Sequence, residues 1–152
     1  MQGPNVPWRR AGILLVMDEQ TARTDGRRDP TLSAWVPVIV WASLIFILSA
    51  QPDLRFLPDS GLDFIVRKIG HMGVFGILAL LVWRALAITT AWTRPWAWAL
   101  VLTVAYAASD ELHQGFVAGR YLSGVDVAID ALGALVAIAA VGIYRSQRVK
   151  RA

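Results

Sequence analysis

Two long stretches without a charged side chain constrain the fold of this chain more than any other feature of its sequence. No Asp, Glu, Lys or Arg lies between Asp29 and Asp53, and none lies between Lys68 and Arg84. A helix needs roughly 20 apolar residues to cross the hydrocarbon core of a bilayer. A helix packed on a soluble core would carry polar residues on its outer face. The sequence therefore predicts an all-α membrane protein.

The amino-acid composition agrees with this interpretation and limits the kinds of partner that the chain is expected to bind. Of the 152 residues, 56% are hydrophobic and 17% are charged, whereas soluble domains average about 25% charged residues. The net charge of +4 is explained by basic residues gathering on the cytoplasmic side of a membrane protein. We therefore expect membrane lipids as partners and no nucleic acid. The chain has no cysteine, which excludes disulfides and thiolate metal sites.

Helix signals divide the apolar sequence into four predicted spans. Pro52 follows the first helix, and Ser60 with Asp63 has the spacing of a capping box at the start of the second. Ser123 and Asp126 repeat that spacing before the last helix. The predicted helices are residues 33–50, 60–88, 95–114 and 123–144.

Small residues mark where these helices are expected to approach their neighbours, since small side chains let backbones pack closely in lipid. They recur at helical spacing as Gly70, Gly73 and Gly76 on the second helix and as Gly133, Ala137 and Ala140 on the fourth.

An even number of spans places both termini on the same side of the membrane. We predict a disordered cytoplasmic segment (1–32), an up-down bundle of four transmembrane helices (33–144) and a basic cytoplasmic tail (145–152), with either Met1 or Met17 as the start. Basic residues gather on the cytoplasmic side. Those near the termini and the second connection are Arg9, Arg10, Arg23, Arg27, Arg28, Arg84, Arg94, Arg145, Arg148, Lys150 and Arg151. Those on the other side, predicted to face outward from the cell membrane, are Arg55, Arg67, Lys68 and Arg120.

Polar side chains gather at the three helix ends that share this outer face. The set is Lys68, His71, Asp110, Glu111, His113, Gln114, Arg120, Asp126 and Asp130. Residues three or four apart share a helix face, so Asp110, His113 and Gln114 are expected to point the same way, with Glu111 about 100° away. Ionisable groups at membrane depth point inward and usually mark function. We therefore interpret the set as a candidate ligand-binding site.

Structural explanations compete with this interpretation. Asp126 lies at a helix start, where capping and the helix dipole favour an acid. Arg120 with Asp126, or Lys68 with Asp110, would form ion pairs that serve only stability. Asp130 is harder to explain in this way, because it lies a turn deeper and needs a partner.

We predict no metal and no cofactor. Glu111 and His113 are two residues apart, about 200° around a helix, and cannot chelate one ion together. A mixed site from His71, His113 and Asp110 stays geometrically open. Ser109 lies near these groups, as does a second serine at 123, but no nucleophile elbow accompanies either.

Two motifs resemble those of the VanZ-like family. One is SDELHQGFVAGR at 109–120, continued by Asp126 and Gly133, and the other is KIGHMGVF at 68–75. The resemblance covers residues 33–144 and implies a compact four-helix membrane domain. The family's founding member is associated with low-level resistance to the glycopeptide teicoplanin, so the resemblance also implies a link to antibiotic resistance in the cell envelope.

The chain departs from the family pattern at four places. Arg67 stands where an Asp is common, Phe75 replaces a frequent Tyr, and the Gly-Arg turn at 119–120 lacks its preceding Pro. Asp130 replaces a frequent Asn. This last change adds a negative charge inside the candidate site.

The residues favour a protein that binds a lipid headgroup or a lipid-linked cell-wall precursor at the outward-facing site. Lys68, His71 and Arg120 would present cationic donors to such a ligand. The first alternative is an intramembrane enzyme with Glu111 or His113 as its acid or base, which requires a pKa shifted toward neutrality. The second is a proton-coupled carrier that uses Asp130.

Overall fold

The computed structural model of the chain describes residues 29–51, 60–117 and 122–151, and the regular structure in these ranges is helical. The helices are α2 (Pro30–Ser49), α3 (Ser60–Thr89), α4 (Pro95–Gln114) and α5 (Gly124–Arg151). The predicted all-α fold is confirmed. α5 continues well past its predicted end at 144, and most of the segment predicted to be disordered lies outside the described residues.

Two helix starts show how the sequence sets these bounds. α2 starts at Pro30 rather than at 33, because the Asp29 carboxylate accepts a hydrogen bond from the Thr31 N–H at 2.8 Å. Proline suits the first helical position, where a missing N–H costs little. α5 starts after Ser123, whose Oγ accepts a hydrogen bond from the Asp126 N–H at 3.3 Å. This is one half of the predicted capping box.

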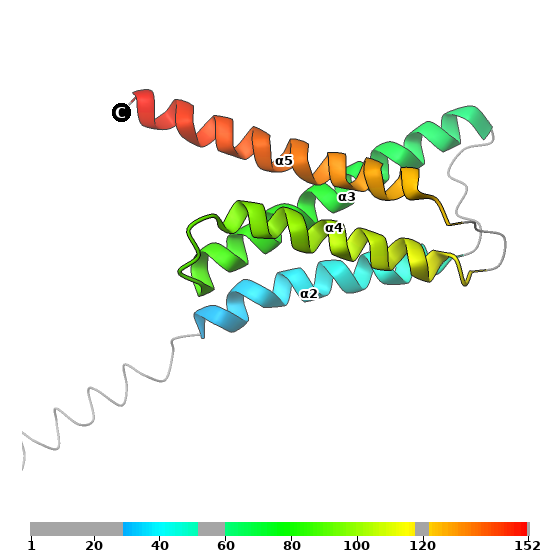
Figure 1. The fold of residues 1–152 in the computed structure, drawn as a ribbon, viewed down its shortest axis with the longest axis horizontal. Coiled ribbons are helices and arrows are strands. Elements are labelled where there is room, and N and C mark those ends of the chain that lie inside the picture. Colours follow the sequence, from blue (N-terminus) through cyan, green and yellow to red (C-terminus); the bar gives the residue numbers. More distant parts are fainter. Residues whose placement is uncertain (1–28, 52–59, 118–121, 152) are drawn as a thin grey trace, which may run out of the picture.

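α3 is the central helix of the fold. It contacts α2, α4 and α5, and Figure 1 shows it crossing the other helices obliquely. The same view places the last residues of α2 and α4 on the same side of the molecule as the first residues of α3 and α5. Polar side chains at these four helix ends can therefore meet.

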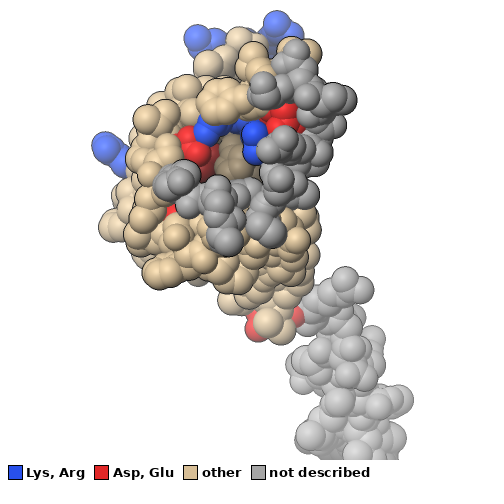
Figure 2. Space-filling model, turned by 90° about the vertical axis from the view of Figure 1, so that its right-hand side faces the viewer, with Lys and Arg blue, Asp and Glu red and all other residues tan. Residues whose placement is uncertain are grey.

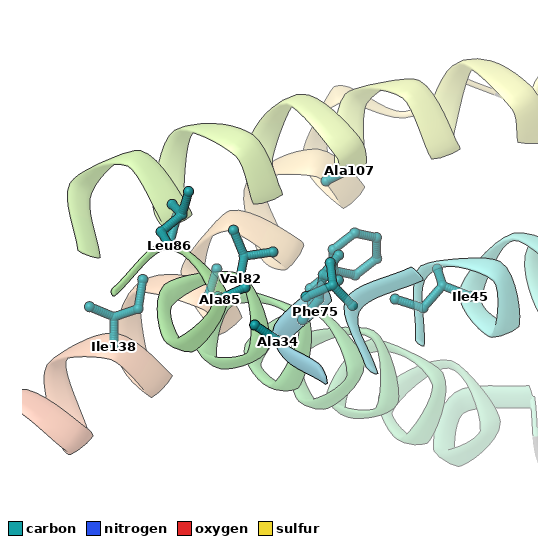
Figure 3. Packing of buried hydrophobic residues seen from close by; sticks show 13 residues of the cluster. Ala34, Ile45, Phe75, Val82, Ala85, Leu86, Ala107 and Ile138 are labelled. Atoms are coloured by element: carbon teal, nitrogen blue, oxygen red, sulfur yellow. The ribbon is translucent and has the colours of Figure 1, made fainter. Parts of the chain in front are cut away.

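The core is apolar and receives side chains from all four helices (Figure 3), among them Ile45 of α2, Ala107 of α4 and Ile138 of α5. Phe75 of α3 is completely buried and is the largest such side chain in the described residues. Residues four apart share a helix face. Burial of Phe75 therefore turns His71, one turn earlier, toward the interior.

α3 and α5 approach each other closely. A Cβ added at Gly133 would lie 2.6 Å from the Met72 Cα, and one added at Gly76 would lie 3.2 Å from the Gly133 carbonyl oxygen. The prediction of close packing is thus confirmed for these two glycines. It is wrong for Gly70 and Gly73, because no described atom of another element lies within 4 Å of a Cβ at either position.

Much of the outer surface is apolar, with exposed side chains such as Val40, Ile69 and Leu135 on three different helices. Large exposed apolar surfaces are unfavourable in water, whereas lipid accommodates them. Among the described helices, α2, α3 from Gly61 onward and α5 are long and apolar enough to cross a membrane. α4 does not reach that level, and its last turn is polar. The fold is therefore that of a membrane protein with three clear candidate spans.

Candidate functional site

Polar side chains from all four helices converge where the ends of α2 and α4 meet the starts of α3 and α5. We call this set the polar site: Ser49, Lys68, His71, Asp110, Glu111, His113, Gln114, Asp126 and Asp130. Figure 2 looks onto this end of the molecule and shows a hollow with both basic and acidic atoms around it. The structure thus brings together the sequence-predicted residues that it describes. Arg120 lies outside the described residues.

The α3–α5 side of the polar site holds two stacked pairs, each made of a basic side chain and an acidic one. The Lys68 Nζ is hydrogen bonded to the Asp126 carboxylate, and both side chains keep about a quarter of their surface exposed. One helical turn deeper, the His71 Nδ1 lies 3.4 Å from the Asp130 Oδ1. Neither of these two atoms makes a hydrogen bond within the described residues. The alternative in which Lys68 pairs with Asp110 does not hold, since Lys68 pairs with Asp126 of α5.

The α2–α4 side is a hydrogen-bonded cluster around Asp110, whose side chain is buried. The Ser49 hydroxyl donates to one Asp110 carboxylate oxygen at 2.5 Å, and the Gln114 amide donates to the other at 2.8 Å. Hydrogen bonds to a carboxylate are stronger than those between neutral groups. Asp110 therefore ties the end of α2 to the end of α4.

The α4–α5 side is joined by Glu111. One of its carboxylate oxygens accepts a hydrogen bond from the Ser123 N–H at 2.5 Å. In a capping box, the acid at the third helical position would occupy that N–H. Here Glu111 occupies it instead, and Asp126 is left to pair with Lys68. The second half of the predicted capping box is thus supplied by another helix.

His113 faces away from Glu111. Its ring stacks on Phe46 of α2, with the centroids 4.1 Å apart. Its Nε2 is buried and makes no hydrogen bond to the part of the chain that the structure describes. Glu111 and His113, the two acid/base candidates from the sequence, therefore do not form a contacting pair. Either residue would have to act as an acid or base without the other.

The remaining alternatives fit the geometry poorly. The exposed Ser109 hydroxyl donates to the carbonyl of Tyr106 at 2.7 Å, and Ser123 serves as a helix cap. The described residues contain no group of three side chains placed to hold a metal ion. His113 stacks against α2 while His71 faces α5, so the mixed metal site does not form.

Sequence reasoning missed the structural roles of two polar residues near this end of the molecule, Ser49 and Asp63. Ser49 was assigned to an apolar span, although its place in the last turn before a polar connector could have marked it. Asp63 was interpreted as a simple helix-start acid, yet its side chain is only 2% exposed and pairs with Arg67 at 3.0 Å. Only the fold reveals such burial, because the sequence does not show which neighbours cover a helix end.

This geometry defines a class: helical membrane proteins with an ionisable polar site built at the ends of packed helices. A family model described as VanZ/LLP1 matches residues 19–145, and the chain belongs to this family. No curated protein matches the chain, and no solved structure does either.

Proposed function

We propose that the chain is a multi-pass protein of the cell membrane with four spans in an up-down bundle and both termini in the cytoplasm. The polar site then faces outward. The ends that meet in Figure 1 support this arrangement, because consecutive helices enter and leave the polar end alternately. α4 is the helix that is not apolar enough to count as a span by composition, and its contacts with α3 and α5 would cover its polar last turn.

We further propose that the polar site binds the headgroup of a membrane lipid or of a lipid-linked cell-wall precursor. The observation that carries this proposal is that ionisable side chains of α3, α4 and α5 meet at one end of the bundle, the end at which Figure 2 shows a hollow with basic and acidic atoms around it. Ionisable groups within a membrane cost free energy, so a protein that keeps several of them usually needs them for its function. Lys68 and His71 supply donors for a phosphate, and Asp126 and Asp130 hold these donors in place.

Lipids that remain bound during purification provide the test. Native mass spectrometry of the purified full chain should detect a retained phospholipid or precursor, and Lys68→Gln should lower its occupancy. Arg67→Gln is the matched control, because Arg67 is adjacent on α3 but pairs with Asp63. Equal loss in both variants, or no retained lipid in the native protein, contradicts the proposal.

A second candidate is an intramembrane enzyme that acts on a lipid-linked substrate. The observation favouring it is the His71–Asp130 pair, since a carboxylate beside one ring nitrogen orients an imidazole for acid/base work through the other. Glu111 and His113 remain separate candidates for the same role. Turnover of a labelled lipid that is lost in His71→Gln but kept in His113→Gln would establish this candidate over binding alone.

Two further roles are less supported. A proton-coupled carrier using Asp130 needs polar groups along the whole bundle, whereas the buried ionisable side chains of the described residues lie at one end. A link to glycopeptide resistance is tested directly by comparing teicoplanin susceptibility in cells that express the native chain or Lys68→Gln. Equal susceptibility of native-expressing cells and empty-vector cells would dismiss the link.

A further inference from the structure

The end of the molecule opposite the polar site carries exposed basic side chains. We call this the basic end: Arg84, Arg94, Arg145, Arg148, Lys150 and Arg151. Figure 1 places the end of α3, the start of α4 and the end of α5 on this same side of the molecule. The acidic side chain that the structure describes on this side is Asp29, which caps α2. The basic end therefore carries a net positive charge in the described residues.

The length of α5 indicates how far its basic residues lie from the centre of a bilayer. A helix of 28 residues is about 42 Å long, whereas the hydrocarbon core is about 30 Å thick. Every described residue of α5 from Gly142 onward is exposed. The last turns of α5 therefore emerge from the hydrocarbon as helix, and their basic side chains lie at the level of the lipid headgroups.

Aromatic rings hold the arginines at this level. The Arg145 guanidinium lies 4.9 Å from the ring centroid of Trp83 on α3, and Arg148 lies 5.2 Å from that of Tyr144. Tryptophan and tyrosine favour the membrane–water interface, and the exposed Trp92 packs against another tryptophan nearby. A ring attracts a cation without neutralising it. The guanidinium groups thus stay fixed near the interface with their charge available.

We propose that the basic end binds acidic phospholipid headgroups in the leaflet it faces. Each Lys or Arg close to an anionic membrane surface contributes about a fivefold preference for it. The basic side chains are all exposed and are spread over the end of α3, the start of α4 and the end of α5. This arrangement fits a layer of headgroups better than a single soluble anion, and it does not depend on the proposed function of the polar site.

Quenching of tryptophan fluorescence by brominated lipid tests the proposal. The full chain is reconstituted in phosphatidylcholine with increasing amounts of brominated phosphatidylglycerol. The native protein should prefer phosphatidylglycerol by about fivefold or more, and added salt should weaken this preference because it screens exposed charges. The triple variant Arg145→Gln, Arg148→Gln, Arg151→Gln should show a much weaker preference, carried only by the basic residues that remain at Arg84, Arg94 and Lys150.

Charge-retaining replacements provide the matched control. Lysine at the same three positions should keep most of the preference. The proposal is overturned if the native chain shows no preference, if the glutamine variant keeps the native preference in full, or if the lysine variant loses as much of it as the glutamine variant. Helical circular dichroism of each variant confirms that the bundle remains folded.

Discussion

At the polar site, Lys68 pairs with Asp126, and Asp110 is buried under two hydrogen bonds. At the basic end, Arg148 and Lys150 are exposed, and Arg148 lies against an aromatic ring instead of an acid. The two ends thus use charge differently. Charged side chains at the polar site join one helix to another, whereas charged side chains at the basic end remain exposed and can interact with lipid headgroups. Substitutions should therefore affect folding at the first end and lipid selectivity at the second.

The close α3–α5 approach keeps the polar site together, and breaking it should have the largest effect. Gly133→Ala places a Cβ against the Met72 backbone. The backbone cannot move aside in the way that a flexible side chain can. We expect a loss of about 3 kcal/mol of stability, at the upper end of overpacking costs, measured by unfolding in mixed detergent micelles. Gly73→Ala is the control, because its Cβ meets no described neighbour. Equal stability of the two variants would show that α3 and α5 pack differently.

The Asp110 cluster should show the next largest effect. Asp110→Ala removes a buried carboxylate that accepts hydrogen bonds from Ser49 and Gln114. Hydrogen bonds to charged groups contribute about 1.5–3 kcal/mol, so we expect a loss of about 2 kcal/mol in the same unfolding measurement. Ser109→Ala, one residue away and exposed, should change little. A neutral result at Asp110 would mean that its charge does not join α2 to α4.

The Lys68–Asp126 pair should contribute less, because water still reaches both side chains. Partly exposed ion pairs contribute about 1 kcal/mol or less. A double-mutant cycle with Lys68→Gln and Asp126→Asn should give a coupling free energy of that size. A cycle with Lys68→Gln and Asp110→Asn should give a clearly smaller one. The reverse order would restore the pairing predicted from the sequence and contradict the structure.

The fold was largely predictable because its signals are local. The uncharged stretches and the cap at Ser123 each act within a few residues, so the helix positions followed closely, although α2 begins at Pro30 and not at 33. The far end of α5 was missed, because a run of basic residues is compatible with either a helix or a tail. Without knowledge of how the helices cross, only local signals of this kind can be used for prediction.

The polar site was predictable as a set of residues but not as a set of pairs. Helix periodicity assigned Lys68 and His71 to one face of α3, yet it could not show which neighbour that face meets. The crossing of α3 and α5 at Gly133 decides this, and it turns Lys68 toward Asp126. Glu111 likewise reaches Ser123 only because α4 and α5 lie together at this end. Tertiary geometry therefore supplied the partners.

The smallest effect on stability should come from the basic end. Arg148→Gln removes an exposed charge whose described contact is the Tyr144 ring on the same helix, and exposed substitutions of this kind rarely change stability measurably. The unfolding midpoint should match that of the native chain, while the preference for phosphatidylglycerol over phosphatidylcholine falls in the quenching assay. Arg148→Lys should restore the preference. If Arg148→Gln destabilised the chain as strongly as Asp110→Ala, charge at the two ends would serve the same purpose and the comparison would fail.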